Sequence, residues 1–289
     1  MSPLEIEAAL AVALVWGVQF LAIKYGVDVF PPLFFVTLRF VGVAAILLPF
    51  AGKPSLRELR SAALISVFFG GLCFGLIYTG IHLGLVGLSA VITQLMTPFT
   101  VLFAWPLLGE RLAARVTAGI ILAFIGVTVA MASPGHAVSL VAVALVAGGA
   151  AAQALGNDLI KRLGSFEIVR LMAWMSFFTV PQVGLASIFL ETGQMAALRS
   201  DDLLAWLSLG YTIIFGAIIG FGLWFWLIGR QSLARVAPFA LLQTVFAIAA
   251  GMVFLHEAVT LPLLAGALTC IVGVLVTQLG GSSTNKKIK

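Results

Sequence analysis

The chain has 289 residues, of which 62% are hydrophobic and only 9% are charged. A soluble domain carries roughly a quarter charged residues, so the composition excludes an ordinary water-soluble globule and indicates a polytopic membrane protein. The formal net charge of +5 would suggest nucleic acid as the partner of a soluble protein. Here we expect the lipid bilayer and no nucleic acid, because the basic residues lie in loops between apolar runs.

Apolar runs separated by turn and charge signals predict ten membrane-spanning helices. They lie near residues 5–24, 33–51, 62–82, 90–108, 114–132, 138–159, 168–190, 204–229, 235–255 and 261–279. Backbone polar groups cannot stay unpaired in lipid, and the runs are too long for alternating barrel strands, so we expect an all-α fold. The first run lacks a basic leader and a cleavage site, which favours a retained helix over a signal peptide.

Basic residues are unevenly distributed among the loops between these helices. Twelve lie in the tail or in the loops after helices 2, 4, 6 and 8: Lys53, Arg57, Arg60, Arg111, Arg115, Lys161, Arg162, Arg230, Arg235, Lys286, Lys287 and Lys289. The other loops contain mainly Arg199, close to Glu191, Asp201 and Asp202. The positive-inside rule therefore predicts that both termini are cytoplasmic, in a multi-pass protein of the cell inner membrane.

Two similar stretches stand half a chain apart, PLLGERL at 106–112 and VFLHEAV at 253–259. Their glutamates, Glu110 and Glu257, are separated by 147 positions (257 − 110). The same shift superposes two pairs of glycines, Gly119 on Gly266 and Gly126 on Gly273. Helices 1 and 6 align with a shift of 137 (161 − 24, two lysines), and the longer loop 191–202 absorbs the difference of ten.

Each half therefore contains five spans, and an odd number forces the second copy to insert in the opposite sense. We expect a first repeat over residues 1–135, an inverted second repeat over 136–281 and a basic tail over 282–289. Many secondary transporters place a midplane substrate site between such inverted repeats. Glu110 and Glu257 have two interpretations: anions at the positive end of the following helix, or gating residues.

Polar and aromatic side chains within spans are candidates for lining a substrate path, because a polar residue facing lipid is costly. The candidate substrate-binding residues are Trp16, Gln19, Arg39, Tyr78, His82, Gln94, Gln153, Asn157, Trp174, Trp224 and Gln243. The candidates for gating or structural roles are Lys24, Glu110, Glu257, Pro98 and Pro238, the prolines by kinking helices 4 and 9. Trp16 also fits an interfacial anchor, and His82 a packing residue.

Helical spacing brings some of these candidates together. Gln19 lies three residues after Trp16, and His82 four after Tyr78, so each pair shares a helix face. Arg39 lies about two turns into helix 2, roughly 9 Å at 1.5 Å per residue. Its side chain can snorkel or pair with Asp28, or it can contact a substrate carboxylate. Patterns such as GAIIG (216–220) permit close helix contacts, for sliding or for static packing.

No acidic residue lies in the middle of a predicted span. Since an uncompensated buried charge is costly, this favours neutral or zwitterionic solutes over polycationic ones. The three histidines and two cysteines form no paired ligand set, so we expect no metal and no other cofactor. The chain also lacks H-E-x-x-H, G-x-S-x-G and paired mid-membrane aspartates, so we do not expect an intramembrane enzyme.

The order and spacing of four stretches resemble the drug/metabolite transporter superfamily, specifically its ten-helix EamA-type exporters. They are ALVWGVQFLAIKYG (13–26), LRF (38–40), TPFTVLFAWPLLGERL (97–112) and LLQTVFAIAAGMVFLHEAVT (241–260). Within that family the chain looks most like bacterial exporters of aromatic and other neutral amino acids. It departs from the commoner pattern at Gln153-Ala154, where many relatives have Trp-Ala, and at His256, where glycine is frequent.

The pattern and the resemblance predict a secondary transporter that exports small amphipathic metabolites, above all aromatic and other neutral amino acids, by alternating access. The expected partner besides lipid is thus a small-molecule substrate. The alternatives are an exporter of nucleosides, sugars or lipophilic drugs, and a channel-like facilitator whose flux does not saturate. A receptor or scaffold does not explain the repeat. The oligomeric state stays open, and a monomer is consistent with the sequence.

Overall fold

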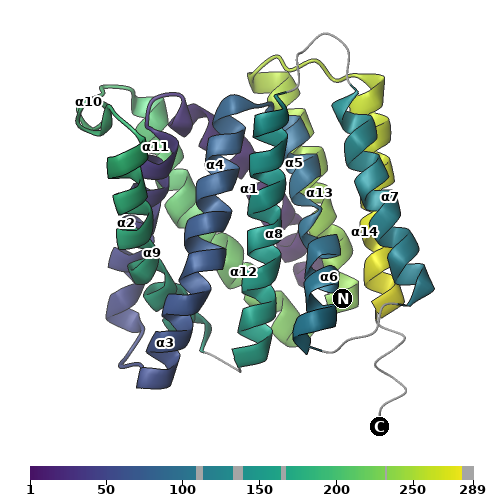
Figure 1. Cartoon of the computed structure of the whole chain (residues 1–289), viewed down its shortest axis with the longest axis horizontal. Coiled ribbons are helices and arrows are strands. Elements are labelled where there is room, and N and C mark those ends of the chain that lie inside the picture. Colours follow the sequence, from purple (N-terminus) through teal and green to yellow (C-terminus); the bar gives the residue numbers. More distant parts are fainter. Residues whose placement is uncertain (109–112, 133–138, 164–166, 232, 282–289) are drawn as a thin grey trace.

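The computed structural model describes residues 1–108, 113–132, 139–163, 167–231 and 233–281. Every regular element in these ranges is helical, which confirms the all-α prediction (Figure 1). Nine helical stretches in this part of the chain are long and apolar enough to cross a membrane, and the apolar part of a tenth helix, 238–254, is shorter. The chain is a multi-pass membrane protein.

The first half forms five spans in chain order. They are α1 (Pro3–Val27); α2 (Pro32–Leu47) with the short η1 (Leu48–Phe50); α3 (Leu56–Ile65), η2 (Ser66–Leu72) and α4 (Cys73–Leu83); α5 (Val86–Thr93) and α6 (Met96–Leu108); and α7 (Ala114–Met131). The third span begins at Leu56 rather than near 62, because Ser55 and Glu58 form a capping box at its start. The fourth span is interrupted at Gln94 and Leu95.

The second half repeats this arrangement. Its elements are α8 (Leu140–Leu163); α9 (Ile168–Leu190); α10 (Gln194–Leu198); α11 (Leu203–Tyr211), η3 (Thr212–Ile219) and α12 (Gly220–Arg230); α13 (Leu233–Phe254); and α14 (Leu261–Gly281). The third span of each half has 28 residues, and the two begin 147 positions apart (203 − 56). Each contains a π-helical segment at its middle, η2 in one half and η3 in the other. The additional short helix α10 occupies the longer loop.

The bundle has two faces of different charge. Gln231 donates to Glu5 at the start of α1 at 3.0 Å, and Arg57 donates to the carbonyl of Leu163 at the end of α8 at 3.3 Å. We call this side the basic face, after Arg57, Lys161, Arg162, Arg170 and Arg235. The opposite, acidic face carries Asp28, Glu191 and Glu257. The first span of the first half, α1, begins at the basic face, whereas the first span of the second half, α8, ends there. The two halves therefore cross the membrane in opposite directions.

The last helices of the two halves, α7 and α14, pack against each other (Figure 1). A Cβ atom on Gly119 would lie 2.7 Å from the carbonyl oxygen of Gly273, and one on Gly126 would lie 2.7 Å from that of Gly266. The sequence repeat had paired these four glycines differently, 119 with 266 and 126 with 273. The reversed pairing in space follows from the antiparallel crossing, and only glycine permits so close a backbone approach.

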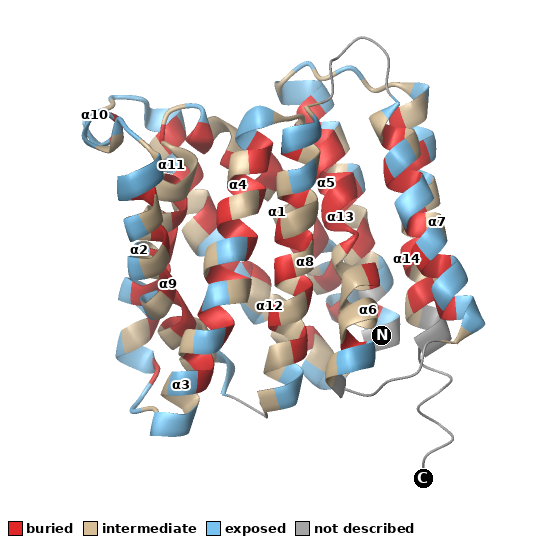
Figure 2. Cartoon of the chain, in the orientation of Figure 1, coloured by how far each residue is buried: buried red, intermediate tan, exposed pale blue. Residues whose placement is uncertain are grey.

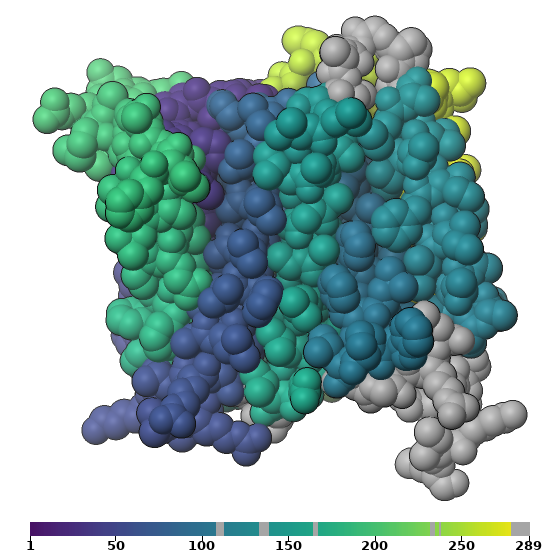
Figure 3. Space-filling model, in the orientation of Figure 1, coloured from purple at the N-terminus to yellow at the C-terminus, as the bar shows by residue number. Residues whose placement is uncertain are grey.

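Burial follows the expectation for a bundle in lipid. Buried residues line the helix contacts, and exposed residues cover the outward faces (Figure 2). Large apolar side chains are among the most exposed, with Phe189 at 80% and Leu261 at 79%. In the space-filling view, side chains of α4, α6 and α8 pack continuously across one such face (Figure 3). Exposed apolar surface of this extent indicates contact with the membrane.

Candidate functional site

The segment η3 is the point on which polar side chains of α1 and α2 converge. The indole Nε1 of Trp16 donates to the carbonyl of Gly216 at 3.2 Å, and Nε of Arg39 donates to the carbonyl of Thr212 at 3.3 Å. The side-chain oxygen of Gln19 rests directly on Gly216, where any Cβ atom would collide with it. Wider π-helical turns are found frequently at functional sites, and here two backbone carbonyls bind side chains from the other half.

Arg39 is fully buried, with 1% exposure. Its guanidinium carbon lies 4.2 Å from the ring centroid of Phe74, a cation–π contact. Its Nη1 is buried and has no hydrogen-bond partner among the described residues. The proposed snorkelling of Arg39 and its pairing with Asp28 are both wrong, because the side chain turns inward and Asp28 instead accepts from Lys24 at 2.8 Å.

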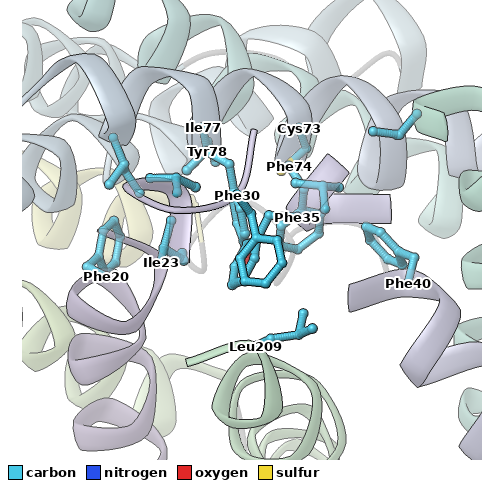
Figure 4. Packing of buried hydrophobic residues seen from close by; sticks show 14 of the residues in the cluster. Phe20, Ile23, Phe30, Phe35, Phe40, Cys73, Phe74, Ile77, Tyr78 and Leu209 are labelled. Atoms are coloured by element: carbon cyan, nitrogen blue, oxygen red, sulfur yellow. The ribbon is translucent and has the colours of Figure 1, made fainter. Parts of the chain in front are cut away.

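Aromatic rings enclose this guanidinium. Tyr78 is completely buried, 5.8 Å from Phe35 and 6.0 Å from Phe74 between ring centroids. Figure 4 shows Tyr78, Phe35 and Phe74 within this cluster of buried side chains. The hydroxyl of Tyr78 is buried without a hydrogen-bond partner in the described part of the chain. A fully buried phenol normally finds such a partner, and the side chain of Thr212 interacts with this one.

A second group of rings lies around Trp16. Its ring centroid is 5.3 Å from that of Phe221 and 5.5 Å from that of Trp224, both on α12. Gln19, one turn further along α1, has a buried Oε1 without a hydrogen-bond partner in the described residues. The shared helix face predicted for Trp16 and Gln19 is confirmed, since both contact Gly216.

The arrangement therefore combines three kinds of group that a zwitterion needs. Arg39 supplies a buried positive charge with a free N–H donor, Gln19 supplies a free acceptor, and the rings supply apolar walls. A buried cation is costly unless it is paired, and the ring faces and one carbonyl compensate Arg39 only in part. Chemically, this cluster is suited to an amphipathic solute that carries a carboxylate.

The other predicted substrate-binding residues on the spans lie at different helix contacts. Gln94 is buried and donates to the hydroxyl of Thr244 at 2.6 Å, which joins α5 to α13. Asn157 donates to the sulfur of Met96 at 3.6 Å. Three further candidates are partly buried elsewhere: Gln153 on α8, Trp174 on α9 against the contact of α2 with α9, and Gln243 on α13.

Lys24 and His82 lie at the acidic face rather than near η3. Lys24 donates to Asp28 at 2.8 Å and to the carbonyl of His82 at 3.3 Å, and the His82 side chain is 41% exposed. Tyr78 and His82 share a helix stripe, but the first is buried and the second is at the end of α4. A cavity of about 280 Å³ opens beside Lys24 and His82, between α4, α5 and the start of α8.

The predicted gating residues have mixed outcomes. Glu257 accepts from the backbone N–H groups of Val86 and Gly87 at 2.7 and 3.0 Å, so it caps α5 of the other half. The expectation that Glu257 caps the next helix, α14, is wrong. The hydroxyl of Thr260 caps that helix instead, by accepting from the backbone N–H of Leu263. Glu110 lies outside the described residues. Pro98 is the third residue of α6, just after the interruption, and Pro238 lies inside α13.

Sequence reasoning missed Thr212, Gly216 and Phe74 as members of the site. Thr212 and Gly216 contribute backbone carbonyls, which every residue type has, so composition gave no signal for them. The GAIIG pattern marked Gly216 as a close-contact position but did not identify its partner. In the described residues, no group of three or more histidines, cysteines or acids could hold a metal ion.

A bundle of two oppositely inserted five-span halves around a buried polar cluster is an architecture found in many secondary transporters. The chain belongs to the EamA-like transporter family, whose profile matches residues 4–132 and 138–279. This finding confirms the resemblance seen in the sequence.

Individual relatives agree with the family. The chain is 31% identical over 282 residues to a probable amino-acid metabolite efflux pump of Salmonella typhimurium and 30% identical to one of Escherichia coli, each match covering 94% of both proteins. An inner membrane transporter of Escherichia coli is 24% identical over 250 residues, covering 84% of this chain and 80% of that one. A crystal structure with 18% sequence identity superposes with a TM-score of 0.65, covering 98% of this chain and 99% of that one, which shows a shared fold.

Proposed function

We propose that this transporter exports small amphipathic metabolites, above all aromatic and other neutral amino acids, across the cell inner membrane by alternating access. The observation that carries the proposal is the fully buried Arg39 with an unpaired Nη1. A carboxylate is the natural partner of a guanidinium, with charge-assisted hydrogen bonds about twice as strong as neutral ones. The names of the two efflux pumps support the substrate class.

The aromatic surroundings support an apolar or aromatic side chain on the substrate. Phe74 and Tyr78 lie beside the guanidinium. Phe221 and Trp224 lie against Trp16, which shares a helix face with Gln19. Rings of this kind bury large area and favour offset contacts with other rings. Polycationic compounds fit less well, since the charged group next to the site is itself a cation.

We further propose that the basic face is cytoplasmic, with both termini on that side, so that substrate leaves at the acidic face. The positive-inside rule supports this orientation. Lys24, His82 and Asp28 then lie at the exit side of the pathway. In alternating access, the two halves rock about the site between them.

Transport into proteoliposomes tests the proposal. A panel of labelled aromatic amino acids, aliphatic amino acids, nucleosides and sugars is offered to the reconstituted full chain, with and without a pH gradient. We expect saturable flux and counterflow with neutral amino acids, aromatic ones first. Flux of nucleosides or sugars in their place would refute the substrate class. Unsaturable flux without counterflow would indicate a facilitator rather than a carrier.

A further inference from the structure

Gln19 carries a polar atom that the protein itself does not use. Its Oε1 is buried and has no hydrogen-bond partner in the described part of the chain. Leaving a buried acceptor unpaired is costly. An unpaired acceptor retained in a transport site is therefore a position for a ligand donor.

The surrounding residues hold this oxygen in place. Gly216 lies directly against it, and a side chain at that position would drive the amide away. The neighbouring Trp16 is fixed by its hydrogen bond to the Gly216 carbonyl at 3.2 Å. The position of Gln19 is thus set where α1 packs against η3.

Arg39 and Gln19 are anchored on the same segment, four residues apart. Arg39 donates to the carbonyl of Thr212, and Gln19 contacts Gly216. The unpaired Nη1 of Arg39 and the unpaired Oε1 of Gln19 therefore belong to side chains that contact the same π-helical segment.

We propose that Gln19 is a specificity-determining residue that recognises the α-ammonium group of the substrate, while Arg39 holds the carboxylate. The inference rests on the proposed function and deepens it, because it names the feature that separates amino acids from simple carboxylates. A carboxylate without the ammonium leaves Oε1 unpaired when it binds. A site built around a buried polar group rejects an analogue that cannot satisfy it.

The test compares L-phenylalanine with 3-phenylpropanoate, which is the same molecule without the amine. Both are measured as substrates of the reconstituted full-length protein. We expect the wild-type protein to prefer phenylalanine by roughly 10- to 100-fold in kcat/KM, the range that one unpaired buried group produces. Gln19→Leu should abolish this preference by slowing phenylalanine while leaving phenylpropanoate nearly unchanged. Gln19→Glu, which keeps an acceptor at the same length, should retain it.

A second variant tests the geometry without removing the amide. Gly216→Ala places a methyl group against Oε1 and should also reduce the preference. Gly222→Ala is the matched control, because no atom lies within 4 Å of a Cβ at that helical glycine, and it should behave like the wild type.

The outcomes separate the two proposals. A preference for phenylalanine that survives in both Gln19→Leu and Gly216→Ala overturns the role of Gln19 and leaves the proposed function standing. Failure of the wild-type protein to carry any amino acid overturns the proposed function, and this inference with it.

Discussion

At the scale of single residues, the residues of the polar site are not repeated at the equivalent positions of the other half. The position equivalent to Arg39 in the second half is Ser176 (39 + 137), which is also buried. The contact between Gln19 and Gly216 has its counterpart where Gly156 meets Phe69, 2.8 Å from a Cβ at that glycine. The duplicated backbone therefore supplies two similar contacts, and only one carries charge and a free acceptor.

Replacing Arg39 tests the role of this charge. Arg39→Leu should lower transport of neutral amino acids by roughly 10- to 100-fold, since a hydrogen bond to a charged group contributes about 1.5–3 kcal/mol. The transport rate of Arg39→Lys should lie between those of the wild type and Arg39→Leu, because lysine keeps the charge but lacks the planar set of N–H donors. Proteoliposome flux is the measurement, and Arg199→Leu, at an exposed arginine of the acidic face, is the control. Unchanged flux in Arg39→Leu would end the carboxylate assignment.

At the scale of elements, two glutamates of the second half cap helices of the first half. Glu257 accepts from Val86 and Gly87 of α5, and Glu191 accepts from Leu33 and Phe34 of α2. In both pairs the distances are 2.7 and 3.0 Å. A carboxylate at a helix N-terminus satisfies unpaired N–H groups and favours the positive end of the dipole. These caps join the two halves at the acidic face.

Removing one cap should loosen this junction. We expect Glu257→Ala to destabilise the detergent-solubilised protein by about 1–2 kcal/mol, the usual effect of losing a helix cap. Thermal unfolding monitored by circular dichroism measures it. Asp201→Ala removes an exposed acid on the same side and should leave the midpoint within error. If both variants have the same unfolding midpoint as the wild type, the two hydrogen bonds of Glu257 do not contribute to stability.

The sequence predicted the spans better than their interior geometry. Span ends came out within a few residues, because the bilayer sets the length of an apolar run. Both irregular features had a readable signal: Ser55 and Glu58 for the early start at Leu56, and Pro98 for the break at Gln94, since proline cannot donate to the carbonyl four residues before it. The π-helical segments and the inward turn of Arg39 arise from packing between distant helices. Periodicity along one helix contains no information on such contacts, so the site could be predicted only as a set of candidate residues.

At the scale of the whole molecule, opposite insertion of the two halves predicts where the chain leaves the membrane. A reporter fused to the C-terminus should be active in the cytoplasm, and one inserted within α10 (Gln194–Leu198) should be active outside. Two reporters measure the side on which each position lies: one is active only in the cytoplasm, and the other is active only outside it. The reverse pattern would invert the proposed direction of export while leaving the site unchanged.

The crossing of α7 and α14 has a consequence for how such a chain is assembled. The glycine contacts of α7 and α14 form between helices that run in opposite directions, so each half needs a neighbour inserted in the opposite direction to make them. Joining both halves in one polypeptide guarantees a one-to-one stoichiometry of upward and downward copies. Each half then needs to insert in one direction only, so the two sequences can differ. Arg39 and Gln19 can therefore be present in the first half alone.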